Sequence, residues 1–148
     1  MTRIKPPQTL LGSPEEIETQ FYEALQGGDI DKLMAVWSDD DEIVCVHPGG
    51  PRLVGAAAIR GSFELLFANG AIDAQPEKIR RVLTDSSAVH NVLERVQVMG
   101  SDGPQAAWVI ATNVYLRSER GWRMVCHHAS PGTPREVQEI IEGATTLH

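Results

Sequence analysis

The sequence has no apolar run that approaches the roughly 20 residues of a membrane-spanning helix. Its first residues, 1–11, also lack the apolar core of a secretory signal. Cysteine is scarce: Cys45 and Cys126 are the two present, and they do not show a metal-type spacing such as Cys-x-x-Cys. We therefore expect a cytoplasmic protein, without a membrane partner, whose thiols are buried and reduced.

Positive charge is scarce as well. The chain has 13 Lys and Arg against 20 Asp and Glu, which gives a net charge of −7. A polyanion needs clustered basic residues, and the one basic cluster, 78–81, fits a solvated strand face. No glycine-rich phosphate loop follows a strand, and the histidine spacings match no structural zinc pattern. We expect no nucleic-acid partner, no metal and no organic cofactor.

The amino-acid composition is typical of one globular domain. Apolar residues make up 42% of the 148 residues and charged residues 22%. A chain of this length buries roughly two thirds of its unfolded surface, so a single core is expected. We divide the domain, 1–148, into an arm (1–12), a core (14–132) and a tail (133–148).

Helical signals fill the first part of the core. Ser13, Pro14 and Glu16 form a capping box that starts a helix, and Gly27-Gly28 end it. Asp29 is a good N-cap for a second helix. A third helix begins at Gly55. Their apolar faces are Ile17, Phe21, Ala24 and Leu25; Ile30, Leu33, Met34 and Trp37; and Ile59, Phe63, Leu66 and Phe67.

Strand signals follow the second helix and then dominate from Ile72 onward. The run 43–46 has a β-branched bias and must stop at His47, because Pro48 cannot donate to a ladder. Residues 52–54 make at most an edge strand. Four longer strands joined by hairpins are predicted at 79–83, 88–99, 106–117 and 122–130. The fold class is α+β: a curled antiparallel sheet wrapped around three helices to make a cone with a hollow mouth.

A second capping box, Thr133 to Glu136, precedes Val137, Ile140 and Ile141 at helical spacing. We predict a short terminal helix, which either closes the mouth of the cone or packs on a neighbouring subunit.

Several motifs carry a family resemblance over roughly residues 14–132. They are Phe21-Tyr-Glu-Ala-Leu-Gln-Gly-Gly-Asp29, Trp37-Ser-Asp-Asp40, His47-Pro48, Val54-Gly-Ala-Ala-Ala-Ile59 and Gly121-Trp-Arg-Met-Val-Cys-His-His-Ala-Ser130. With this order of elements, the chain resembles the cone-shaped superfamily of nuclear transport factor two, steroid Δ-isomerases, SnoaL-type polyketide cyclases and the association domain of calmodulin-dependent kinase. It is most similar to SnoaL-like proteins of unassigned role.

The resemblance to the steroid isomerases implies roles for three positions. His47-Pro48 looks like the site of their general base. Phe21 matches the tyrosine of their oxyanion hole, and Asn113 matches their protonated aspartate. A phenyl ring cannot donate to an enolate, so the oxyanion apparatus is at best halved. Tyr22 lies about 100° around the helix and is not counted as a replacement.

Each candidate residue also has a structural interpretation. His47 is a general base or a structural histidine, and Asn113 donates in a pocket or stabilises a turn. His127 and His128 are adjacent in a strand and point to opposite faces, so one of them lines the pocket. The remaining pocket-lining candidates are Phe21, Trp37, Phe63 and Tyr115. For the large rings of Trp37, Phe63 and Trp108, filling the core is the favoured alternative to lining a pocket.

Three functions remain open. The first is an isomerase, cyclase or dehydratase-like lyase that abstracts a proton from a small apolar carbonyl compound, with His47 as base and Asn113 as donor. The second is a module that binds a small apolar or acidic ligand without chemistry. The third is an assembly domain. Long strands that are apolar on both faces need a cover, so we predict a homodimer through the outer face of the meander.

Overall fold

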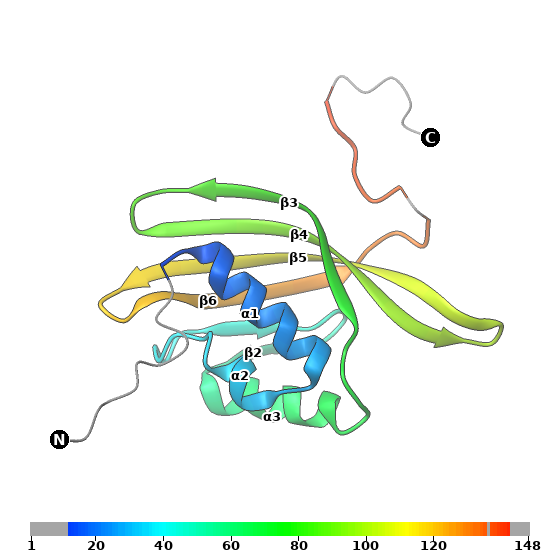
Figure 1. Cartoon of the computed structure of the whole chain (residues 1–148), viewed down its shortest axis with the longest axis horizontal. Helices are drawn as coiled ribbons and strands as arrows, with labels where there is room; N and C mark the ends of the chain where they lie inside the picture. Colours follow the sequence, from blue (N-terminus) through cyan, green and yellow to red (C-terminus); the bar gives the residue numbers. More distant parts are fainter. Residues whose placement is uncertain (1–11, 136, 143–148) are drawn as a thin grey trace.

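A computed structural model describes residues 12–135 and 137–142 of the chain. Two helices come first, then two short strands and a third helix, and four long strands follow (Figure 1). The elements are α1 (Pro14–Gly27), α2 (Ile30–Met34), β1 (Val44–Val46), β2 (Arg52–Val54), α3 (Ala56–Phe67), β3 (Ala74–Leu83), β4 (Ser87–Gly100), β5 (Gly103–Ser118) and β6 (Gly121–Pro131).

One six-stranded sheet has the order β2-β1-β6-β5-β4-β3. The meander from β3 to β6 is antiparallel, as predicted. The short strand β1 differs, because it pairs in parallel with β6, with Val44 opposite Cys126. The prediction of an antiparallel sheet therefore holds for the meander, and the sheet as a whole is mixed.

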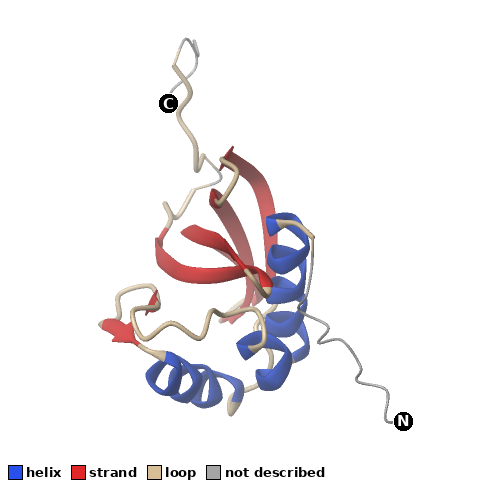
Figure 2. Ribbon diagram, turned by 90° about the vertical axis from the view of Figure 1, so that its left-hand side faces the viewer, coloured by secondary structure: helices blue, strands red, loops and turns tan. Residues whose placement is uncertain are grey.

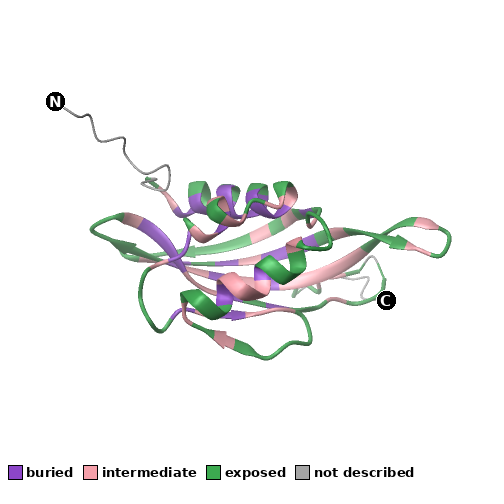
Figure 3. Ribbon diagram, turned by 90° about the horizontal axis from the view of Figure 1, so that it is seen from below, coloured by how far each residue is buried: buried purple, intermediate pink, exposed green. Residues whose placement is uncertain are grey.

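The sheet curls around the helices, which lie on its concave side (Figure 2). The β3–β4 register shifts between Glu77 and Arg80, and β3 bends in this stretch (Figure 1). Such a bulge increases local twist. Buried residues gather where the helices face the sheet (Figure 3). The predicted cone is thus confirmed, with its core between α1, α2, α3 and the concave face.

Local capping explains where the first two helices begin and end. The Glu16 amide donates to Ser13 Oγ at 3.2 Å, which caps α1. Gly28 closes α1 in the left-handed region, with φ 62°. The Lys32 amide donates to the Asp29 carboxylate at 3.0 Å and caps α2. These caps match the predicted ones, although α2 ends at Met34, before Trp37.

The predicted terminal helix is wrong for the described part of the tail. Residues 137–142 contain no helix, and Ile140 is 71% exposed. The Thr133 hydroxyl donates to the Val137 carbonyl, and the Gln138 side chain bonds both the amide and the carbonyl of Thr133. These local hydrogen bonds compete with a helix. Residue 136 of the capping box, residues 143–148 and most of the arm, 1–11, lie outside the described residues.

Among the described residues, no helix has the length and apolar character that crossing a membrane would require.

Candidate functional site

The concave face of the sheet carries polar side chains inside the core. Strand alternation places His90 and Glu94 of β4 on this face, together with Asn113 of β5 and His127 of β6. All four are at most 5% exposed. Helix α1 supplies Glu18 and Tyr22, which are equally buried. Buried polar groups cost free energy unless they are paired, so their hydrogen bonds decide what they do.

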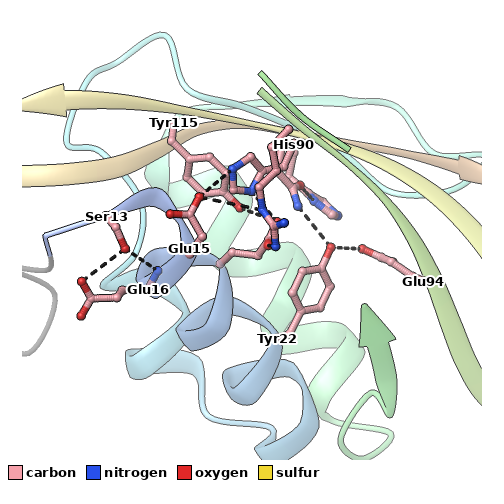
Figure 4. A network of polar contacts seen from close by, with 11 residues as sticks. Ser13, Glu15, Glu16, Tyr22, His90, Glu94 and Tyr115 are labelled. Carbon is pink, nitrogen blue, oxygen red and sulfur yellow. Dashed lines mark hydrogen bonds and ion pairs between the residues drawn. The ribbon is translucent and has the colours of Figure 1, made fainter. Parts of the chain in front are cut away.

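Four of these residues form a chain of hydrogen bonds that we call the Tyr22 network: His127, Asn113, Tyr22 and Glu94. The Asn113 amide Nδ2 donates to the Tyr22 oxygen at 3.1 Å. The Tyr22 hydroxyl donates to Glu94 Oε2 at 2.6 Å (Figure 4). His127 Nδ1 lies 2.5 Å from Asn113 Oδ1, which only accepts, so Nδ1 carries the proton. Every donor therefore points from His127 toward Glu94, and His127 Nε2 keeps a free lone pair.

Burial controls the charge of this network. Desolvation raises the pKa of Glu94 to about 7, against a smaller lowering by the Tyr22 hydrogen bond. It also raises the pKa of Tyr22 well above its usual value, with the Glu94 charge adding to the effect. The pKa of His127 falls to about 3 through burial, then through His47 and His128. At neutral pH, Tyr22 and His127 are uncharged and Glu94 is close to half protonated.

A second group, the Glu18 network, ties α1 to β4 and β5 (Figure 4). His90 Nδ1 lies 2.8 Å from Glu18 Oε2, and its Nε2 lies 3.4 Å from Glu15 Oε2. The Tyr115 hydroxyl donates to the same Glu18 oxygen at 3.4 Å. Arg81 lies 3.8 Å from the carboxylates of Glu15 and Glu18. With its charges paired in this way, the Glu18 network anchors the helix to the sheet.

His47 follows β1 and is half-buried. Its Nε2 lies 2.9 Å from Ser62 Oγ on α3. The Ser62 hydroxyl already donates to the Ile59 carbonyl at 2.8 Å, so Ser62 Oγ accepts from His47 Nε2–H. The lone pair of His47 is then on Nδ1. Burial lowers the pKa of His47, so the ring is neutral at pH 7 and its Nδ1 can accept a proton.

Aromatic rings connect His47 with the Tyr22 network. The His47 ring meets Phe63 edge-on, with centroids 4.8 Å apart. Phe63 packs on Phe21 at 6.3 Å, and Phe21 contacts the His127 ring at 4.9 Å. Two neutral histidines therefore flank a wall of two phenyl rings.

The structure brings part of the predicted set together. Asn113 and His127 are hydrogen-bonded, and Phe21 and Phe63 lie between His127 and His47. The other three candidates lie elsewhere. His128 is exposed on the opposite sheet face, and Tyr115 belongs to the Glu18 network. Trp37 packs in the core beside Met124, and its indole N–H has no hydrogen-bond partner within the described part of the chain.

Sequence reasoning missed Tyr22, Glu94, Glu18 and His90. A usable signal was present in β4, where Ala88, His90, Val92 and Glu94 alternate with Val89, Asn91 and Leu93. Glu18 and Tyr22 are four residues apart, which places both on one side of α1. Polar residues at such inward positions indicate a buried network.

Four of the surface hollows that residues 12–135 and 137–142 form are lined by residues other than His47, Asn113 and His127. The largest of these four hollows has a volume of about 730 Å³ and lies between the turn that follows α2 and strand β6. Asp40, Arg52 and Cys126 are among its lining residues. The predicted cavity at the mouth of the cone is not among the four, and it stays a prediction. Two buried small side chains, Ala111 and Ala129, are paired across β5 and β6, one inward position beyond Asn113 and His127.

No metal site is formed by the histidine, cysteine and acidic residues within 12–135 and 137–142. Both cysteines are unpaired thiols, and burial raises the pKa of Cys45 to about 12.

A family model described as the SnoaL-like domain matches residues 15–134. Among proteins whose function has been curated, none matches this chain.

Two solved structures share substantial identity with the chain. The first, from Thiobacillus denitrificans, is named as a candidate calcium/calmodulin-dependent protein kinase type II association domain; it is 35% identical, with a TM-score of 0.74, over 83% of this chain and 98% of that one. The second, from Streptomyces avermitilis, is named as a candidate dehydratase from the NTF2-like family; it is 30% identical, with a TM-score of 0.72, over 84% and 97%.

A third similar structure, from Caulobacter vibrioides, is an uncharacterised protein with a cystatin-like fold. It is 15% identical over 81% of this chain and 87% of that one, with a TM-score of 0.70. This likeness concerns the fold alone.

Proposed function

The chain belongs to the SnoaL-like family, and from this premise we propose that it binds a small carbonyl compound at the mouth of the cone and transfers a proton on it. The observation that carries the proposal is the Tyr22 network. The Glu94 carboxyl group in this network has a pKa of about 7, so burying it costs folding free energy at neutral pH. Shifted pKa values of this kind cluster at functional sites.

His47 is the base in this proposal. Its Nδ1 removes a proton from the carbon next to the carbonyl, and the electron pair of that C–H bond moves onto the carbonyl oxygen. The proton on the imidazolium then returns to another carbon, which completes an isomerisation, or assists loss of a leaving group, which completes a dehydration. Ser62 orients the ring by accepting from Nε2, so the correct tautomer is held before substrate arrives.

Glu94 is the acid that faces the developing negative charge. Below its pKa the carboxylic acid donates from Oε1, while Oε2 still accepts from Tyr22. Both polar atoms of the Asn113 side chain are engaged by Tyr22 and His127, so Asn113 is a positioning residue in this scheme. His47 follows β1 and Glu94 lies on β4, three strands away in the sheet. At about 4.8 Å per strand, β1 and β4 lie roughly 14 Å apart along the sheet, and the inward curl of the sheet and the lengths of the two side chains shorten the gap that a substrate must bridge.

Cyclohex-3-enone is a suitable probe, because its isomerisation to the conjugated ketone is followed by ultraviolet absorption. We expect His47→Gln to abolish turnover at every pH. The matched control is His128→Gln, on the exposed face of β6, which should leave the rate unchanged.

The pH profile tests the two roles separately. Because His47 must be neutral, the rate should rise with pH through its lowered pKa. Because Glu94 must be protonated, the rate should fall above about pH 7, and Glu94→Gln should remove this fall. Equal effects of His47→Gln and His128→Gln would rule out His47 as the base.

A second candidate function is assembly. The Thiobacillus protein is named as a candidate association domain, and a row of apolar residues crosses the outer face of this sheet. We call it the valine row: Val82, Val89, Val114, Cys126, Val44 and Val54. The two functions use opposite faces of the sheet, so one chain can serve both.

A further inference from the structure

A hollow of about 430 Å³ lies on the outer face of the sheet, where the tail crosses it. Its floor is formed by Leu93, Ala106 and Trp108 from β4 and β5, and its rim by Pro134, Arg135 and Gln138 of the tail. This volume falls within the usual range of small-molecule sites. The hollow is separate from the Tyr22 network, which lies on the other face.

The tail is held over the hollow at two points. The Gly132 amide donates to the Trp108 carbonyl at 2.8 Å, and a Cβ at position 132 would lie 2.9 Å from the Trp108 Cβ, so glycine permits this close crossing. Farther along, Glu139 pairs with Arg80 of β3 at 3.1 Å. Contacts with the sheet on both sides of the rim residues therefore hold the tail in place over the hollow.

Positive charge converges on this hollow. Lys78, Arg95 and Arg135 line it, against the single carboxylate of Glu77. Within the described residues none of these three cations is in an ion pair, whereas the two arginines of β3, Arg80 and Arg81, both are. The three side chains are exposed, and in a chain with a net charge of −7 their convergence on one hollow favours an anionic ligand.

The bulge in β3 brings Lys78 to the site. Lys78 has φ 46°, a left-handed conformation that non-glycine residues seldom adopt. It lies within the register shift between Glu77 and Arg80. Bulges of this kind commonly redirect a side chain.

Trp108 adds an aromatic surface to the charge. Trp108 is half-buried, and on the neighbouring strand it is paired with Arg95, so the two side chains share the outer face. A flat ring stacks well on an indole, and a guanidinium binds a carboxylate through two parallel hydrogen bonds. We propose that this hollow binds a small aromatic carboxylic acid, with its ring on Trp108 and its carboxylate among Arg95, Lys78 and Arg135.

The test is a titration followed by the indole N–H signals in NMR spectra of the isotope-labelled protein. The probes are benzoate, the uncharged benzamide and inorganic phosphate, and Trp108→Phe assigns the relevant signal. We expect benzoate to shift the Trp108 signal saturably and in a salt-dependent manner. Benzamide and phosphate should bind at least about tenfold more weakly, because each lacks one of the two recognised parts.

Arg95→Gln should weaken benzoate binding by about tenfold or more, through loss of charge-assisted hydrogen bonds. Arg117→Gln, an exposed arginine of β5 that does not line the hollow, is the matched control and should change nothing. The proposal would be overturned if both variants weakened benzoate binding equally. It would also be overturned if benzoate left the Trp108 signal of the folded protein unchanged. If phosphate bound as tightly as benzoate, the proposed stacking of an aromatic ring on Trp108 would be wrong.

Discussion

The carboxyl group of Glu94 is 5% exposed, and its Oε2 accepts a hydrogen bond from Tyr22. Burial raises its pKa from 4.5 to about 7. Because the folded state holds this proton more tightly than the unfolded chain does, Glu94 contributes stability below pH 4.5 that is lost as the pH rises through 7. His127 acts in the opposite sense: its pKa falls from 6.5 to about 3, so its contribution is present above pH 6.5 and is lost on acidification.

Glu94→Gln separates the two effects. Glutamine keeps an acceptor for Tyr22 and cannot ionise. The free energy of unfolding of the variant, relative to the natural protein, should therefore rise by about 3 kcal/mol between pH 4.5 and pH 8. Urea unfolding at pH 4.5, 6 and 8 measures it, with the exposed Glu119→Gln as the control. A difference that does not vary with pH would show that Glu94 titrates normally.

Single residues were predictable where the chain forces a position. Pro48 ends β1 and so fixes His47 at its end. Strand alternation put Asn113 on one face with Ala111 and Tyr115, and the family resemblance identified this face as the inner one. Tyr22 was dismissed because it lies about 100° from Phe21 around the helix. The buried surface of α1 is wide enough to include both, since Glu18, Phe21 and Tyr22 are all buried. A helix wrapped by a curled sheet buries more than one narrow stripe.

The turn between α1 and α2 depends on Gly28. Its φ of 62° is in the left-handed region, whereas Gly27 ends the helix itself. Gly28→Ala should cost about 1 kcal/mol, because a Cβ disfavours this conformation. Gly27→Ala, whose added Cβ would have no atom within 4 Å, should stabilise the helix by up to about 1 kcal/mol. Melting temperatures that move in opposite directions are expected, and a fall in both would contradict the argument.

Elements were predictable where local signals and tertiary packing agree. The caps at Ser13, Asp29 and Gly28 place α1 and the start of α2, and runs rich in β-branched and aromatic residues between polar turns place the long strands. The terminal helix failed because its capping residue, Thr133, bonds the Val137 carbonyl and the Gln138 side chain instead. The parallel pairing of β1 with β6 could not be read from β1 alone, because a strand of three residues carries no information about its partner.

At the scale of the molecule, the valine row supports the proposed homodimer. Val82 is 68% exposed, Val54 44% and Val89 40%. Contiguous apolar surface of this kind is uncommon on monomers. Val114→Lys places a charge in the middle of the row and should convert a dimer into monomers. Leu65→Lys, on α3 and 75% exposed, should leave the dimer intact. Sedimentation of the natural protein at the 16.2 kDa of one chain, at micromolar concentration, would disprove the dimer.

The parallel pairing of β1 with β6 also affects how the chain is made. Val44 finds its partner only when Cys126 has left the ribosome, so the edge of the sheet that presents His47 is completed last during synthesis. Until then, β1 and β2 have only each other in the sheet, and an isolated two-stranded ribbon is at best marginally stable. Contacts between residues so far apart in sequence slow folding. A chain released before β6 would display unpaired edges on β1 and β5, which makes it a natural substrate for chaperones and proteases.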